Sequence, residues 1–338
     1  MIARGRAASN RPPAGLLPGA RFRALTTALR RGAQLDRRRW RTWRQYWIRD
    51  PAIGALLFGL HHVTRALPVD WRSAIGSAGG VLFGRYLDHP GNARARRNYL
   101  RLSPTPVSEA EADAAMTRMW TGFGRLAAEW LIADRLWRAG RVEVVGLHHL
   151  AEARDAGRPH LMMGLHLANW EVFGMAMYEL GFPGKYTYLP PPNRFLHRMF
   201  LRARKGWGKP LPPSFAGSRE AWRTLVEERG ALVIWVDDFI RGVGVTAPLF
   251  GRPALPRSNL SNIVRLTLAS EAALLPFFVE RLNRARFRLT ILPEVQLARS
   301  GDSAADLAEN TRRIDALITP IITARLEQWF LLPYLRLE

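Results

Sequence analysis

The sequence predicts an α/β fold: a mixed central sheet flanked by helices, with an N-terminal helical membrane-associated region before it. Two observations support this. After Gly140, short apolar runs of strand length alternate with segments of helix length. Before it, residues 46–139 have a helical pattern throughout. With 338 residues, 48% of them hydrophobic, the chain can bury a substantial core.

The elements after Gly140 follow in a regular order. The expected strands are Val142–Val145, Leu161–Leu165, Tyr186–Leu189, Ala231–Val236, Ala273–Val279 and Phe287–Leu292. The expected helices are Trp170–Leu180, Phe195–Lys205, Ser218–Arg229, Ser258–Ser270 and Ala304–Phe330. In α/β sheets reactive groups gather where strands end and helices begin, so we expect a functional site at one of these junctions.

The clearest helix before Gly140 covers Ser108–Ala139. Ser108 is a plausible N-cap, acids at Glu109 and Glu111 fall in the first turn, and Gly140 follows as a stop. We therefore expect three regions, of which residues 46–338 form one folded unit. These are a basic, partly disordered N-terminal arm over 1–45, a helical membrane-proximal region over 46–139, and an α/β catalytic core over 140–338.

Positive charge is concentrated at the N-terminus. The chain carries 50 Lys+Arg against 28 Asp+Glu, and residues 1–50 hold 13 Arg and two acids, which gives +11 of the net +22. Trp40, Trp43 and Trp47 alternate with these arginines. The segment is expected either to be a solvated arm or to lie in a layer of anionic lipid headgroups, where Arg binds phosphate and Trp lies at the interface. A nucleic-acid binder is the more distant alternative, because the region after Gly140 shows no motif of that class.

We expect the protein to lie on a membrane without crossing it. No window reaches the roughly 18 apolar residues of a spanning helix. The nearest, Pro51–Thr64, has 14 residues, two of them histidines, and is predicted to be an interfacial or hydrophobic surface helix. No secretory signal peptide is expected, because Met1–Gly32 lacks an apolar core followed by a cleavage site. The absence of cysteine excludes disulfides, thiolate catalysis and Cys-type metal sites.

The most informative junction follows the strand Leu161–Leu165. His166 comes directly after it, and a helix is expected to begin near Asn169, a natural cap, with Glu171 in its first turn. On one continuous helix a spacing of five would place His166 and Glu171 about 140° apart. They can meet only if His166 lies in the turn before the helix, where the carboxylate could reach one ring nitrogen.

This arrangement suits general-base catalysis. A hydroxyl that attacks a thioester must lose its proton, and a neutral imidazole accepts protons well near pH 7. A carboxylate on the other ring nitrogen fixes the tautomer and stabilises the imidazolium, as in the serine-protease triad, with the substrate hydroxyl in place of the serine. A structural histidine is the competing interpretation. No metal is expected, because the spacing is not H-E-x-x-H.

The segment G-L-H-L-A-N-W-E at 164–171 resembles the signature of the bacterial lipid A biosynthesis (lauroyl/myristoyl) acyltransferase family, which runs close to H-x-G-N-W-E. The resemblance extends in order from about Trp47 to Trp329. It includes Arg97-Asn98, Gly124-Arg125 with Glu129, Val144–Leu147, Tyr188–Asn193 and Leu249–Ala254.

The resemblance implies a glycerolipid acyltransferase-like fold and a specific reaction. A fatty acyl chain would pass from an acyl carrier protein thioester, or from acyl-CoA, to a lipid hydroxyl, with no other cofactor. The family default acceptor is a lipid A precursor at the cytoplasmic face of the inner membrane. His166 would be the general base and Glu171 its support. The implied partners are acyl carrier protein, an anionic membrane surface and the lipid acceptor, and no nucleic acid. Intact His166 and Glu171 argue against a catalytically silent relative.

Two departures leave the acceptor open. The family usually has Tyr-Arg-Pro where this chain has Tyr188-Leu189-Pro190, and Arg194 is a candidate replacement for that arginine. The family tends to have Asp-Gln where this chain has Asp237-Asp238. Another glycolipid, a phosphoinositide mannoside or an aminolipid are therefore alternative acceptors.

Several further residues are candidates for substrate binding, each with a structural alternative. Asp237 and Asp238 are expected to belong either to a binding site or to a surface turn. Arg252 is expected either to bind a phosphate or to stabilise a turn. Arg204, with Lys205 and Lys209, is expected to form either a basic cluster that faces lipid headgroups or a solvated face. Glu129 is expected in a structural ion pair. The full candidate set is Asn169, Tyr188, Asn193, Arg194, Arg204, Asp237, Asp238, Gly251 and Arg252.

Overall fold

The computed structural model describes residues 37–212 and 214–337, so most of the predicted arm, residues 1–36, lies outside the described residues. The chain divides into two compact units. The smaller comprises Met1–Ala66 with Leu189–Ala203, and the larger Leu67–Tyr188 with Arg204–Glu338. These bounds differ from the predicted division at residue 139, because helices that precede the sheet complete the core beneath it through Met116 and Met119.

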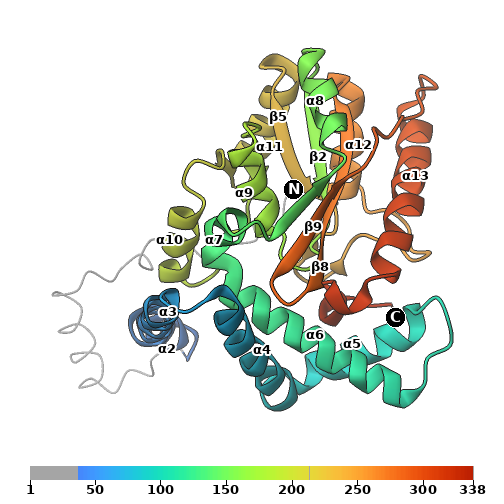
Figure 1. The fold of residues 1–338 in the computed structure, drawn as a ribbon. Helices are drawn as coiled ribbons and strands as arrows, with labels where there is room; N and C mark the ends of the chain where they lie inside the picture. Colours follow the sequence, from blue (N-terminus) through green and yellow to red (C-terminus); the bar gives the residue numbers. More distant parts are fainter. Residues whose placement is uncertain (1–36, 213, 338) are drawn as a thin grey trace, which may run out of the picture. The chain divides into compact units, whose positions relative to one another are not determined.

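The larger unit is built on a seven-stranded mixed sheet (Figure 1). The strand order is β1-β9-β8-β2-β5-β3-β4, and only β8 and β9 pair antiparallel. The strands are β1 (Val142–Val145), β2 (His160–Gly164), β3 (Lys185–Thr187), β4 (Pro210–Leu211), β5 (Ala231–Trp235), β8 (Ala273–Asn283) and β9 (Arg286–Ile291). A separate antiparallel pair is formed by β6 (Phe239–Ile240) and β7 (Gly244–Val245). The predicted α/β class with a mixed sheet is confirmed.

Helices cover both faces of this sheet, as Figure 1 shows. In β2, Leu161 and Met163 belong to the core under one set of helices, and Met162 to the core under the other. Burial on both faces explains why the strand is apolar from Leu161 onward. One set is α7 (Ala133–Arg138), α8 (Leu147–Asp155) and α9 (Glu171–Glu179), and the other is α11 (Phe215–Trp222) with η3 (Arg223–Glu227), α12 (Asn259–Ser270) and α13 (Ser303–Thr323).

Before the sheet the larger unit is helical, as predicted. Its elements there are α4 (Val69–Tyr86), α5 (His89–Leu102), α6 (Glu109–Glu129) and η2 (Trp130–Ile132), followed by α7. Ser108 caps α6: its Oγ accepts from the backbone N–H of Glu111 at 3.2 Å, and the Glu111 carboxylate accepts from the backbone N–H of Ser108 at 2.9 Å. This reciprocal pair confirms the predicted start of the helix.

The end of the chain differs from the prediction. The helix expected to reach Phe330 ends at Thr323, and the short turns η4 (Leu326–Gln328) and η5 (Leu332–Tyr334) follow. The physical reason is that this segment hydrogen-bonds to the chain after β2. The backbone N–H of Ala168 donates to the Gln328 carbonyl at 2.9 Å, and that of Phe330 to the His166 carbonyl at 3.0 Å. In a continued helix these backbone groups would instead form hydrogen bonds within the helix.

The described part of the smaller unit contains α2 (Arg37–Arg44), η1 (Gln45–Arg49), α3 (Asp50–Arg65) and α10 (Arg194–Ala203). Gly54 of α3 lies against Phe195 of α10: an added Cβ would come within 2.6 Å of the Phe195 Cβ. On another face of α3, Leu56 and Val63 are 68% and 74% exposed, as expected of a hydrophobic surface helix. Among the described helices, none is long and apolar enough to cross a bilayer.

Candidate active site

The candidate site lies where two neighbouring parallel strands end. Gly164 of β2 is in register with Trp235 of β5, and the backbone N–H of Val236 donates to the Gly164 carbonyl at 3.0 Å. His166 and Asp237 therefore lie next to each other, at the edge of the sheet where the two strands end. The Nδ1 of His166 lies 2.9 Å from Oδ1 of Asp237, and the His166 backbone N–H donates to Oδ2, also at 2.9 Å.

Asp237 is held by a third donor. Its side chain is fully buried, and Trp329 Nε1–H donates to Oδ2 at 2.8 Å. A buried carboxylate is stable only when donors satisfy it. Because Asp237 accepts, His166 Nδ1 must carry the hydrogen, which leaves Nε2 of the neutral ring as a proton acceptor. The His166 side chain is 25% exposed, so a substrate can approach it.

The predicted pairing of His166 with Glu171 is wrong. Glu171 is buried, and both of its oxygens accept from the guanidinium of Arg204, one of them at 2.8 Å. Burial alone would lower the pKa of Arg204, but the charge and hydrogen bonds of Glu171 outweigh it and raise the pKa. The planar fork of arginine satisfies both carboxylate oxygens at once, and Asp237 serves the imidazole instead.

This pairing also overturns the predicted basic cluster. Only 12% of the Arg204 side chain is exposed, so it packs against Glu171 and does not face solvent with its neighbours. Its guanidinium carbon lies 4.6 Å from the ring centre of Tyr188, another candidate, whose pKa burial raises to about 12. Lys209 is exposed and pairs with Glu220 at 2.8 Å. Arg204 and Tyr188 are thus parts of a buried support for the first turn of α9.

Asn169 does not cap α9 through its side chain. Its Nδ2 donates to Glu129 at 3.4 Å, and within the described chain its Oδ1 accepts no hydrogen bond. Glu129 is fully buried and pairs with both terminal nitrogens of Arg281 at 2.9 and 2.8 Å, which confirms its predicted structural ion pair. The turn between His166 and α9 includes Ala168, whose backbone has a positive φ of 47°. Because Asn169 donates to Glu129, the Glu129–Arg281 pair supports this turn.

Aromatic side chains surround the imidazole. The ring centres of Trp170 and Trp235 lie 5.0 and 5.7 Å from that of His166. Phe330 lies 5.0 Å from Trp170 and continues the apolar wall. Such a wall excludes water, which strengthens the His166–Asp237 hydrogen bond and suits an alkyl chain more than a polar ligand.

Asp238 is a separate, half-buried carboxyl in the larger unit. Thr246 Oγ1 donates to its Oδ1, and the backbone N–H of Asn259 lies 3.4 Å from its Oδ2. Burial raises the pKa of Asp238 to about 7, although the bond from Asn259 lowers it in part.

Replacement of Asp238 by asparagine tests this raised pKa. Between pH ~4 and ~7 the unfolded carboxyl is ionised while the folded one holds its proton, so the stability of the wild type falls with rising pH in this window. The variant has no such group. We expect its free energy of unfolding to gain on that of the wild type by on the order of 3 kcal/mol between pH 4 and 7. Urea denaturation across this range measures the difference, and a constant difference would contradict the assignment.

Arg252 stabilises a turn. Its guanidinium donates to the carbonyls of Leu249, Val245 and Pro248 at 2.8, 2.9 and 2.7 Å. The backbone therefore uses the donors that a substrate phosphate would need. Gly251 lies in the same turn with a φ of 80°, a conformation that favours glycine.

Asn193 and Arg194 belong to the smaller unit. The Asn193 Oδ1 accepts from the backbone N–H of Phe195 at 2.9 Å and so caps α10. Arg194 donates to the Tyr46 carbonyl at 2.8 Å and lies 3.8 Å from the centre of its ring. Within their unit both side chains have structural contacts.

Sequence reasoning missed the partnership of His166 with Asp237 and the contribution of Trp329. One signal was present: His166 and Asp237 each follow the C-terminal end of a predicted buried strand, at the same position relative to the strand end. Trp329 had no such signal, because it lies within a predicted helix whose end the pattern did not locate. Arg281 had none either, because it lies beyond the predicted strand Ala273–Val279, in the part of β8 that the pattern did not include.

Three comparisons with known proteins show what the chain resembles. A family model described as bacterial lipid A biosynthesis acyltransferase matches residues 44–335. The chain is 24% identical over 227 residues to a phosphatidylinositol mannoside acyltransferase from Mycolicibacterium smegmatis, covering 63% of this chain and 70% of the relative. A solved 1-acyl-sn-glycerophosphate acyltransferase from Thermotoga maritima is similar with a TM-score of 0.35 and 13% identity, over 81% of this chain and 99% of that one.

Proposed function

Because the chain belongs to the bacterial lipid A biosynthesis acyltransferase family, and is thus a lipid O-acyltransferase, we propose that it acylates a glycolipid hydroxyl with His166 as general base. The acyl group comes from a carrier thioester. The observation that carries this proposal is the hydrogen-bonded series Trp329–Asp237–His166, which leaves the second ring nitrogen of a partly exposed imidazole to meet a substrate.

The reaction follows from this geometry. The acceptor hydroxyl donates a hydrogen bond to Nε2 of His166 and passes its proton to that atom as its oxygen attacks the thioester carbonyl carbon. The imidazolium that forms is stabilised by the Asp237 carboxylate. The tetrahedral adduct then expels the thiolate, which takes the proton from Nε2. A new ester and a free thiol result, and His166 returns to its neutral form.

In this proposal Glu171 is a positioning residue that helps to hold the His166 imidazole in place. Its ion pair with Arg204 is buried beneath the first turn of α9, five residues after the base. The Glu129–Arg281 pair holds the intervening turn through Asn169. Both pairs fix where the imidazole stands, and general-base catalysis depends on that placement.

The proposed donor is acyl carrier protein, with acyl-CoA as the alternative. Acyl carrier proteins are acidic, and this chain has a net charge of +22, so electrostatic attraction favours their encounter. The same charge favours an anionic membrane surface. We place the protein at the cytoplasmic face of the inner membrane, as a peripheral or monotopic protein.

The proposed acceptor is a lipid A precursor, the acceptor that the family's description suggests. A mannosylated phosphoinositide is the second candidate, because the Mycolicibacterium relative is a phosphatidylinositol mannoside acyltransferase. Leu189 and Asp238 stand where the lipid A enzymes usually have other residues, which favours testing both acceptors.

A transfer assay with the purified full chain tests the proposal. Palmitoyl thioesters of acyl carrier protein and of CoA are each offered with a lipid A precursor, a phosphoinositide mannoside and a lysophosphatidate, and the products are identified by mass spectrometry. We expect one glycolipid to gain an acyl chain and lysophosphatidate to gain none. Failure of both donors with all acceptors would overturn the proposal, as would preferred acylation of lysophosphatidate.

A further inference from the structure

Helix α4 packs with its smallest residues inward. Gly76, Gly80 and Gly84 follow one another at four-residue intervals and face α6. A Cβ added to Gly80 would lie 2.1 Å from the carbonyl oxygen of Trp120, and one added to Gly124 would lie 2.0 Å from that of Gly76. The two helices therefore touch backbone to backbone, and no large side chain fits between them.

The opposite face of α4 carries large apolar side chains that point outward. Trp71, Ile75, Leu82 and Tyr86 fall within about 60° of one another around the helix axis. They are 68%, 49%, 58% and 60% exposed. A helix in water normally buries such a face, and a continuous exposed apolar stripe marks an interaction surface.

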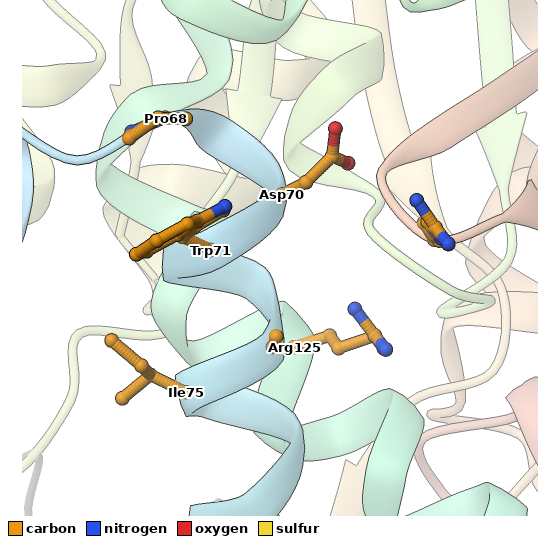
Figure 2. Close-up of a pocket in the computed structure, with 7 residues that line it drawn as sticks. Pro68, Asp70, Trp71, Ile75 and Arg125 are labelled. Atoms are coloured by element: carbon orange, nitrogen blue, oxygen red, sulfur yellow. The ribbon is translucent and has the colours of Figure 1, made fainter.

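A pocket of about 640 Å³ lies beside the first two turns of this helix. Its walls include Trp71 and Ile75 of α4, Arg125 of α6 and Arg284 in the turn between β8 and β9. Figure 2 shows Asp70 and Arg125 extending to one side of α4, while Trp71 and Ile75 extend to the other. Because Trp71 and Ile75 line the same pocket as Arg125 and Arg284, the apolar stripe borders a polar basin at this end of the helix.

This basin has more positive than negative charge. The one carboxylate in its lining, Asp70, is already paired with Arg141 at 2.8 and 2.7 Å. Arg125 donates to Ser73 Oγ at 2.8 Å, and within residues 37–212 and 214–337 no carboxylate forms an ion pair with Arg125 or Arg284. Burial lowers the pKa of Arg125, and the positive charges of Arg281 and Arg284 add to this effect, which Glu129 and Asp70 offset only in part. An anion in the pocket would relieve the repulsion.

We propose that this surface, Trp71, Ile75, Leu82 and Tyr86 with Arg125 and Arg284, docks the protein on an anionic bilayer. The apolar stripe enters the boundary between headgroups and acyl chains, where tryptophan and tyrosine are favoured. The two guanidinium groups bind the phosphate of a lipid headgroup through charge-assisted hydrogen bonds. Apolar contact next to phosphate recognition matches a phospholipid surface, since a soluble acidic protein would leave the stripe exposed. The surface is independent of the reaction at His166.

Binding to vesicles tests the charged half of the surface. The full chain, Arg284→Gln and Arg219→Gln are sedimented with vesicles of phosphatidylcholine alone or mixed with phosphatidylglycerol. Arg219 is an exposed arginine of α11 and serves as the matched control. We expect Arg284→Gln to weaken binding to the anionic vesicles about fivefold, with Arg219→Gln changing it less than twofold. Equal losses for both variants would overturn the phosphate site.

The absence of cysteine in the chain makes the apolar half testable by a single label. An environment-sensitive fluorophore is attached to Leu82→Cys and, as control, to Arg219→Cys. We expect a blue shift from the label at position 82 when anionic vesicles are added, and none at position 219. Unchanged emission at position 82 in a protein that sediments with the vesicles would overturn the docking face. So would weaker retention of Arg284→Gln on DNA with unchanged vesicle binding, which would assign the pocket to nucleic acid.

Discussion

Replacement of His166 by alanine is expected to lower the rate of acyl transfer by about 10²–10⁴-fold, the usual contribution of a general base. The acceptor hydroxyl would then have to lose its proton to water. The measurement is the initial rate with a defined acyl thioester and the acceptor found in the transfer assay. Near wild-type turnover in this variant would contradict the assignment of His166 as the base.

Alanine also leaves Asp237 buried without one of its donors, which can disturb the fold. His166→Asn is therefore the matched second variant, because its amide nitrogen can take the place of Nδ1 and still donate to the carboxylate. We expect His166→Asn to lose activity as His166→Ala does while its melting temperature stays closer to that of the wild type. A comparable loss in both separates the chemical role from a structural one.

The second large effect is expected from Asp237→Asn. All three groups around this carboxylate, the His166 ring, the His166 backbone and the Trp329 indole, donate hydrogen bonds to it. An amide can accept on one side only, so its NH₂ would face a donor or force the imidazole into the other tautomer, with Nε2 protonated. We expect kcat to fall by about 10⁴-fold, as for the equivalent change in serine proteases. Steady-state kinetics checks it, and a kcat within threefold of the wild type would contradict the role of Asp237.

Glu171→Gln provides the contrast between the two carboxylates. This change leaves the buried Arg204 without its counter-charge, so the expected first effect is on stability, at about 3–5 kcal/mol. Chemical denaturation measures it alongside the kinetics. A Glu171→Gln protein of normal stability with a kcat as low as that of Asp237→Asn would return the base-supporting role to Glu171.

Much of the fold could be predicted because its signals are local. The run Ala231–Val236 is apolar since both faces of β5 are covered, and the structure has β5 at Ala231–Trp235. Ser108 and Glu111 predicted the start of α6 through groups three residues apart. The family resemblance was confirmed by the model that matches residues 44–335. Where local signals compete with distant partners, as after Thr323, the prediction was wrong.

By itself the sequence determined the class of fold, the place of His166 at the end of a buried strand, and the family. These depend on periodicity, caps and motifs, which act over a few residues. Only the tertiary structure decided which carboxylate meets the imidazole. Asp237 is 71 residues away and reaches His166 because β2 and β5 lie in register, whereas Glu171, only five residues away, is held by Arg204. Likewise, the glycines of α4 are visible in the sequence, but their packing on α6 turned the apolar face of that helix outward.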